Sequence, residues 1–429
     1  MRSFQLIGSF IVVTLAQFCA VTASADIRQV PESYPTIQGA IDVSFAGDIV
    51  EVGPGLWQES INFGGRAITV RSTAGAATTI VDPVSGRCFT ATGQKGAAAR
   101  LEGFTLRGGS ASHGGGVYIE SSSPVLANCV ITGNTATQFG GGVYVESGSL
   151  KLIGCTVSLN NGFYSGGGVY LSNGSATLEG CTVSGNTLTY GGDTHGGGIF
   201  VNSPASLVLT GGAVMGNSCR TYGGGVMSYG QVSASGVAIS SNSVTATNGR
   251  GGGLHCLNYT PQLSNCTVSS NTSGGDGGGL WTSASMSLIG CTVELNDAGG
   301  YGGAWYVSNG SSSLQNSQVR NNSATTVGGV WVQSGSLSVG STLFCGNGVN
   351  INGTWTNGGG NQLDGQCAPF CPGDSNGDTF IDARDIAEIL ADWGACTGSP
   401  CYSDFNGNGI VNGADLAYAL SGWGRCPGW

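Results

Sequence analysis

Residues 140–168 read GGGVYVESGSLKLIGCTVSLNNGFYSGGG, and this stretch decides the fold. It begins and ends with three glycines, and further Gly triplets begin at 114, 196, 223, 251 and 277, with degenerate copies near 301 and 327. An asparagine follows the same spacing, at Asn134, Asn160, Asn186, Asn217, Asn242, Asn271, Asn296, Asn322 and Asn347. Two markers that share one period of 24 to 30 residues show that the chain is built from repeats.

Within each repeat the apolar residues alternate with other residues, as in residues 116–120 and 142–146. Alternation with a period of two is typical of β-strands, and a repeat of this length leaves no room for a crossover helix. We therefore expect a coil of parallel strands, in which each repeat stacks on the next at about 4.8 Å. The recurring asparagines are then expected to form a hydrogen-bonded amide ladder.

The repeats resemble those of the right-handed parallel β-helix proteins of the pectin lyase-like superfamily. The pairing of Gly-Gly-Gly-Val with aliphatic-x-x-Asn is similar to the repeats of chlamydial polymorphic membrane proteins, over about residues 100–350. Residues 34–41 and 53–61 look like the opening of secreted β-helix proteins, in which a short amphipathic helix caps the first turn. The resemblance implies an all-β, right-handed parallel β-helix of about 12 rungs over residues 26–365, with a cap at about 30–60.

The composition excludes several classes of partner. Of 429 residues, 79 are Gly and only 9% are charged, and the formal net charge is −10. With 14 Lys and Arg there is no basic surface for phosphates, so we expect no nucleic acid or anionic membrane as partner.

The first 25 residues have the features of a signal peptide. A charged start at Arg2 is followed by an apolar run and then by Ala23-Ser24-Ala25, a small-residue cleavage site. A membrane anchor is the alternative, but polar and small residues interrupt the run. We expect a secreted protein, extracellular or at the cell surface, with no membrane span after cleavage.

Five cysteines occupy one column of the repeat, five residues before the asparagine. Adjacent turns are close enough for disulfides, but the column alternates with inward aliphatic residues, which favours a ladder of buried thiols. These cysteines are Cys129, Cys155, Cys181, Cys266 and Cys291.

The segment after Cys367 is an internal duplication with a period of 30 residues. Oxygen-bearing residues recur at loop positions 1, 3, 5, 9 and 12, with a backbone carbonyl expected at position 7, which is the ligand set of Ca²⁺. The predicted ligands of two calcium ions are Asp374, Asn376, Asp378, Phe380, Asp382 and Asp385 in the first loop, and Asp404, Asn406, Asn408, Ile410, Asn412 and Asp415 in the second.

Each predicted loop leads into one short helix, and no long helix precedes the loop. In this asymmetry residues 366–429 resemble a dockerin module. The resemblance implies calcium binding and a cohesin-like protein module as partner. Thr379 departs from the glycine usual in the family, and the residues at loop positions 10 and 11 are not the usual Ser/Thr pair. The four repeated cysteines of the module, Cys371, Cys396, Cys401 and Cys426, are expected to form two disulfides.

The coil is poor in residues for catalysis. The only candidates are Glu120 and Glu146, which lie one turn apart in an outward column, where the spacing approaches that of a retaining glycosidase pair. The next positions of that column supply no third polar group. Two carboxylates that splay into solvent are therefore the favoured interpretation, and a polysaccharide lyase or glycoside hydrolase is the alternative function.

A column of mostly aromatic residues lies beside the inward aliphatic column, and alternation therefore predicts that it faces outward. An exposed aromatic stripe marks a binding surface or a covered face, and aromatic faces stack on sugar rings. We expect a non-catalytic protein that binds polysaccharide or a cell-surface partner; a purely structural role is a further alternative. The predicted carbohydrate-binding residues are Tyr118, Tyr144, Tyr170, Phe200, Trp281, Trp305 and Trp331, with Met227 and His255 in the same column.

Overall fold

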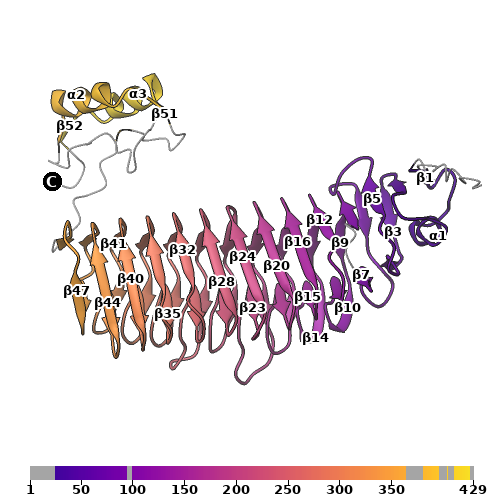
Figure 1. The fold of residues 1–429 in the computed structure, drawn as a ribbon, viewed down its shortest axis with the longest axis horizontal. Helices are drawn as coiled ribbons and strands as arrows, with labels where there is room; N and C mark the ends of the chain where they lie inside the picture. Colours follow the sequence, from indigo (N-terminus) through magenta and orange to yellow (C-terminus); the bar gives the residue numbers. More distant parts are fainter. Residues whose placement is uncertain (1–24, 94–98, 364–379, 396–402, 404–409, 426–429) are drawn as a thin grey trace, which may run out of the picture.

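The computed structural model describes residues 25–93, 99–363, 380–395, 403 and 410–425. Residues 25–363 form a coil of parallel strands that stack turn upon turn along one axis (Figure 1). The predicted parallel β-helix of about 12 turns is confirmed, and one of its sheets has 12 strands. The predicted signal peptide, apart from Ala25, lies outside the described residues.

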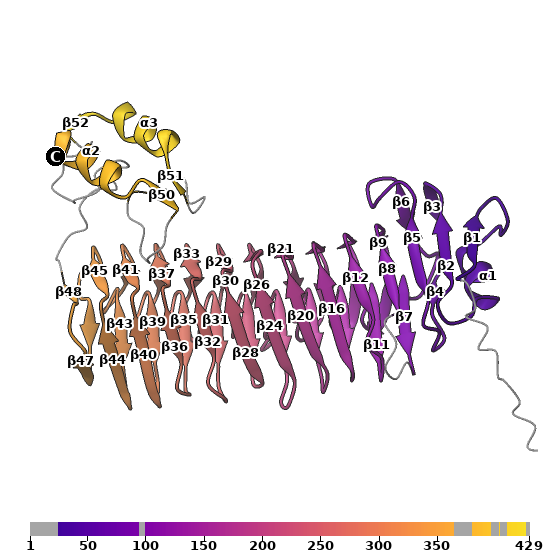
Figure 2. The ribbon, with the colours of Figure 1, turned by 45° about the horizontal axis from the view of Figure 1, so that its top comes forward.

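Three long sheets run along the coil, each built from one strand of every successive turn (Figure 2). The first sheet contains β1 (Ile27–Val30), β2 (Ile49–Val52), β5 (Thr69–Ser72), β8 (Arg100–Glu102), β12 (Val125–Ala127), β16 (Ser149–Ile153), β20 (Ser175–Glu179), β24 (Ser206–Thr210), β28 (Gln231–Ser235), β32 (Gln262–Ser264), β36 (Ser287–Ile289), β40 (Ser311–Gln315), β44 (Ser336–Gly340) and β47 (Trp355–Asn357).

The second sheet contains β4 (Ile61–Asn62), β7 (Phe89–Thr92), β11 (Val117–Glu120), β15 (Val143–Val145), β19 (Val169–Leu171), β23 (Ile199–Val201), β27 (Val226–Ser228), β31 (Leu254–Cys256), β35 (Leu280–Thr282), β39 (Trp305–Val307), β43 (Val330–Val332) and β46 (Ile351–Asn352). The third sheet contains β3 (Gly55–Trp57), β6 (Thr79–Val81), β9 (Thr105–Arg107), β13 (Val130–Thr132), β17 (Thr156–Ser158), β21 (Thr182–Ser184), β25 (Ala213–Met215), β29 (Ala238–Ser240), β33 (Thr267–Ser269), β37 (Thr292–Glu294), β41 (Gln318–Arg320), β45 (Leu343–Cys345) and β48 (Gln362–Leu363).

Two short sheets form where the chain passes from the third sheet to the second. One contains β10 (Ser110–His113), β14 (Thr135–Phe139), β18 (Asn161–Gly162) and β22 (Thr187–Leu188). The other contains β26 (Ser218–Cys219), β30 (Ser243–Val244), β34 (Thr272–Ser273), β38 (Asp297–Ala298) and β42 (Ser323–Ala324). The loops after these strands carry several of the side chains of the candidate site.

Helix α1 (Ile37–Asp42) lies at the N-terminal end of the coil, where the sequence predicts a cap. Thr36 begins the helix by accepting a hydrogen bond from the Gly39 amide at 3.1 Å. Ile37, Ala40 and Ile41 are buried against the first turns. The helix therefore covers apolar surface that the end of a solenoid leaves open.

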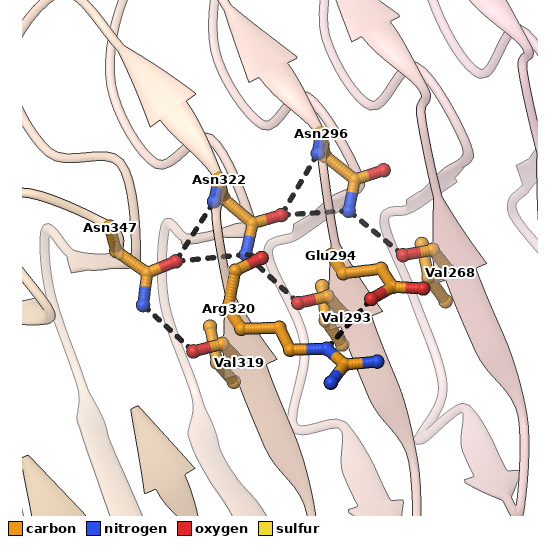
Figure 3. Close-up of polar contacts among 8 residues, drawn as sticks. All are labelled: Val268, Val293, Glu294, Asn296, Val319, Arg320, Asn322 and Asn347. Atoms are coloured by element: carbon orange, nitrogen blue, oxygen red, sulfur yellow. Dashed lines mark hydrogen bonds and ion pairs between the residues drawn. The ribbon is translucent and has the colours of Figure 1, made fainter. Parts of the chain in front are cut away.

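The recurring asparagines form the predicted amide ladder (Figure 3). Asn160 Nδ2 donates to Asn186 Oδ1 at 3.0 Å, and Asn186 Nδ2 donates to the Val157 carbonyl at 3.0 Å and to Asn217 Oδ1 at 2.9 Å. The ladder is buried. A Cβ on Gly142 would lie 2.8 Å from Asn160 Nδ2, so the third glycine of each triplet leaves room for the ladder.

The cysteines of the column are buried free thiols, as expected. Cys129, Cys155, Cys181, Cys266 and Cys291 belong to the core, together with the free thiols Cys88 and Cys256. The amide of Cys129 lies 3.4 Å from Cys155 Sγ, and the amide of Cys155 lies 3.4 Å from Cys181 Sγ. The thiols act as small apolar groups that fill one inward column.

The C-terminal segment is a small duplicated unit. Helices α2 (Ala383–Ala391) and α3 (Gly413–Ser421) are flanked by the antiparallel pairs β49 (Phe380–Ile381) with β52 (Gly424–Arg425), and β50 (Gly394–Ala395) with β51 (Ile410–Val411). The strands of each half pair with those of the other. Its buried core contains Ile381, Ile389, Val411 and Ala419.

Candidate functional site

The aromatic column of the second sheet is largely buried, so the prediction of an exposed stripe is wrong. Trp281 is 4% exposed, and Tyr144, Tyr170 and Phe200 are also buried. The side chains do lie outside the aliphatic core, but they stack on one another, with ring centroids 5.2 Å apart for Tyr144 and Tyr170. Aromatic residues of the preceding loops cover them, as Phe139 does at 4.8 Å from Tyr170.

Trp305 does not belong to this column at all. It pairs with Leu280 and Val330 in the inward column and is 1% exposed within the main core. Ala304 stands where the other repeats have the third glycine, so the triplet of this repeat begins at Gly302 and Trp305 takes the inward position that follows it. Tyr306 takes the outward place, between Trp281 and Trp331.

The two ends of the column are less covered. Tyr118 and Trp331 are half-buried. Met227 and His255 are fully buried in the middle of the column. Of the predicted carbohydrate-binding residues, only Tyr118 and Trp331 therefore keep a partly accessible ring.

A polar cluster surrounds Tyr118 at the N-terminal end of the column. The Tyr118 hydroxyl donates a hydrogen bond to Glu146 Oε2 from the next turn, and the Arg87 guanidinium lies over the Tyr118 ring, 4.5 Å from its centroid. Arg87 Nε also donates to the His113 carbonyl at 2.9 Å. Glu120 lies on the same strand as Tyr118 and is exposed. We call Arg87, His113, Tyr118, Glu120 and Glu146 the polar cluster.

The electrostatics of the polar cluster keep its aromatic groups neutral. Burial raises the pKa of Tyr118, and the hydrogen bond to Glu146 raises this pKa further. Burial, together with the nearby Arg87, lowers the pKa of His113. At neutral pH Tyr118 is therefore a hydrogen-bond donor and His113 an uncharged ring.

The structure thus adds polar groups to the two predicted carboxylates. The column of Glu120 and Glu146 by itself predicts no third polar group. Tyr118 comes from the adjacent column, and Arg87 from a loop before the regular repeats. The column of Glu120 and Glu146 does not predict Tyr118 or Arg87, because these long side chains reach it from other columns.

A second feature, absent from the sequence predictions, is an exposed aromatic group on the loops that lead to β19 and β23. Tyr164 is 38% and Tyr190 is 40% exposed, and their ring centroids lie 4.9 Å apart. Phe163 is half-buried beneath them, 5.3 Å from Tyr190. The signal was present: Tyr164 and Tyr190 are one repeat of 26 residues apart. We call Phe163, Tyr164 and Tyr190 the tyrosine platform.

Six of the twelve predicted calcium ligands lie within the described residues, at equivalent places in the two halves. Asp382 and Asn412 cap α2 and α3, and the buried Asp385 and Asp415 each accept a hydrogen bond from the cap amide, at 2.8 and 3.0 Å. Phe380 and Ile410 begin the short strands. The other six predicted ligands, Asp374, Asn376, Asp378, Asp404, Asn406 and Asn408, lie outside the described residues, as do the four cysteines of the module.

Within the described ranges, no three His, Cys, Asp or Glu side chains gather as a metal site. The described half of each loop still fits a calcium site, since it places a buried carboxylate beside the start of a helix. No helix in the described part of the chain is long and apolar enough to span a membrane.

The match to one family model agrees with the described coil. Residues 89–258 match the family model described as right handed beta helix region, which is less than half of the chain. No curated protein matches the sequence. Among solved structures, the A-module of the mannuronan C-5 epimerase AlgE6 from Azotobacter vinelandii is similar, with a TM-score of 0.34 and 13% identity over 77% of this chain and 94% of that one. The main body of this chain is therefore a right-handed parallel β-helix, similar over residues 89–258 to that family.

Proposed function

We propose that this protein is a secreted, non-catalytic β-helix that binds a polysaccharide or a glycan-bearing cell-surface partner. A dockerin-like module that binds two calcium ions anchors it to a cohesin-like protein. The rigid coil displays the binding surface, and the C-terminal module provides attachment.

The tyrosine platform carries the proposal. Two exposed tyrosine rings are tilted against each other and supported by Phe163, which meets Tyr164 edge-on. They offer apolar faces with hydroxyl groups at their edges, which suits the mixed apolar and polar faces of a sugar. Ring contacts hold the platform in place, so little side-chain entropy is lost when a ligand binds. It replaces the buried aromatic column as the carbohydrate surface.

The C-terminal module supports the anchoring part. Its two halves repeat the same capping arrangement, and the carboxylates of Asp385 and Asp415 are buried in both. A buried carboxylate at loop position 12 is what a bound Ca²⁺ would neutralise. In the described part of the module the core contains four buried apolar residues, and a core of this size depends on such additional stabilisation.

A polysaccharide array tests the binding. The wild type should bind at least one glycan, and Tyr164→Ala with Tyr190→Ala should lose that binding. Tyr259→Ala is the matched control, because Tyr259 is an exposed tyrosine away from the platform. If the wild type binds no glycan, the purely structural alternative replaces this proposal.

The polar cluster favours a second candidate function, a polysaccharide lyase or glycoside hydrolase. Tyr118 bonded to Glu146, with Arg87 beside them, combines a neutral proton donor, a carboxylate and a cation. The same array should be assayed for released unsaturated or reducing sugars. Release by the wild type that Glu120→Gln or Glu146→Gln abolishes would establish the enzyme instead of the binder.

A further inference from the structure

We propose that the ligand is an extended, neutral glycan chain that lies along the coil axis across five successive turns. This proposal rests on the proposed function. Its rings stack on the tyrosine platform at one end, and its hydroxyl groups bind the polar cluster at the other.

The path follows a continuous line of contacts. Arg87 Nε binds the His113 carbonyl, and the His113 ring lies 5.6 Å from that of Phe139. Phe139 lies 5.9 Å from Tyr164, and Tyr164 lies 4.9 Å from Tyr190. Each contact joins neighbouring turns, so the line runs parallel to the axis over four intervals, roughly 19 Å at the usual strand spacing. We call these five residues the track.

Parallel bridges between successive turns run beside the track, although the register shifts between Ala111 and His113. His113 pairs with Phe139, and Phe139 with Ser165, in parallel bridges. A ligand that follows such a line must itself be extended. Glycans whose hydroxyl groups are all equatorial, such as cellulose-type glucans, are extended and present apolar ring faces.

Polar groups accompany the aromatic rings along the track. Gln138 and Thr189 are exposed beside the platform, and the backbone carbonyl of Gln138 accepts from the amides of Phe163 and Tyr164 at 3.1 and 2.9 Å. These amides therefore hold the platform loop, while the Gln138 side chain remains at the surface. Such groups supply the hydrogen bonds that fix sugar orientation.

The charge of the track excludes a polyuronate. Among the described residues, Glu120, Glu146 and the exposed Asp193 flank it, against the cation Arg87, and the whole chain carries −10. A chain of uronate carboxylates would meet negative charges at both ends of the track. A neutral glycan avoids this repulsion and can donate its hydroxyl protons to the carboxylate oxygens.

Titration calorimetry with cello-oligosaccharides from the disaccharide to the hexasaccharide tests the inference, with oligogalacturonates of matched length as the charged comparison. The hexasaccharide should bind at least about tenfold more tightly than the disaccharide, because only the longer chain reaches the polar cluster. Oligogalacturonates should bind more weakly at every length, most clearly at low salt.

Variants separate the two ends. Glu146→Ala, and Arg87→Gln as a milder change, should remove most of the gain with length and leave disaccharide binding intact. Tyr164→Ala should weaken all lengths. Glu179→Gln, a surface ion-pair residue of the first sheet, is the control. Affinity that does not change with length, or tighter binding of oligogalacturonates, would overturn the track while leaving the proposed function standing. Absence of binding to any glycan would overturn both.

Discussion

The Tyr118 hydroxyl donates a hydrogen bond to the carboxylate of Glu146, a residue 28 positions later in the chain and one turn further along the coil. The stacking of neighbouring turns thereby brings together a donor and an acceptor that are far apart in the sequence. Arg87, from the turn before, lies over the same ring. Three turns thus build one polar cluster.

This relationship predicts a loss of stability at alkaline pH. The folded-state pKa of Tyr118 is raised above its usual value, so its contribution is present below about pH 10 and is lost as the pH rises beyond it. Tyr118→Phe should therefore lose less stability than the wild type between about pH 8 and pH 10.5. Urea unfolding at both pH values checks this, with the exposed Tyr190→Phe as control. Equal losses in wild type and Tyr118→Phe would contradict it.

A prediction at acid pH concerns His255. Burial lowers its pKa to about 3, so the unfolded chain binds more protons between about pH 6.5 and pH 3, and stability falls as the pH falls through that range. Its Nε2 is buried without a hydrogen-bond partner, and its ring lies 4.2 Å from Trp281. Phe fits this aromatic environment, so His255→Phe should flatten the acid loss measured by urea unfolding. A variant as acid-sensitive as the wild type would show that other groups dominate.

The amide ladder predicts a large effect of one interior substitution. Asn186→Ala removes the acceptor of two hydrogen bonds from Asn160 and the donor to the Val157 carbonyl. Each buried group left unsatisfied costs about 1–3 kcal/mol, so the free energy of unfolding should fall by several kcal/mol. The exposed Asn173→Ala should change it by less than about 0.5 kcal/mol. Chemical unfolding monitored by circular dichroism compares the two variants. Similar losses of unfolding free energy would show that the ladder does not stabilise the coil.

The inward position of Trp305 and the outward position of Trp331 predict unequal effects of the two tryptophans. Trp305→Ala should cost about 3–5 kcal/mol, because the ring is removed from the core. Trp331→Ala should cost about 1 kcal/mol or less, since its half-buried ring contributes mainly stacking across turns. Thermal and urea unfolding measure both. If Trp331→Ala proves the more destabilising, the register described for β39 is wrong.

Calcium should fold the C-terminal module. Chelation should increase hydrogen exchange in α2 and α3 and leave the coil unchanged, because removal of the cation would leave the predicted calcium ligands of each loop to repel one another. Asp385→Asn with Asp415→Asn keeps the capping acceptors but should weaken calcium binding. Glu388→Gln, on the exposed face of α2, is the control. Unchanged exchange after chelation would contradict a calcium site.

The sequence by itself determined the coil, because each turn repeats the same short-range chemistry. The alternation around Val143, the glycines that leave room for Asn160 and the thiol at Cys155 each recur with one spacing, so a single repeat predicts its neighbours. The sequence also predicts the duplicated half-loops at Asp385 and Asp415, because the spacing that defines each loop lies within a few consecutive residues.

Only the tertiary structure decided which surfaces are accessible and which side chains meet. Alternation correctly placed Trp281 outside the aliphatic core, but the loops before each glycine triplet and the neighbouring rings cover it. Trp305 faces inward because Ala304 takes the place of the third glycine, and only the strand pairing showed that alignment. The polar cluster at Tyr118 and the platform at Tyr164 depend on contacts between turns. The burial of a side chain depends on which other residues pack over it. The alternation along a strand predicts the side of the sheet that a residue faces, but not whether that side is covered.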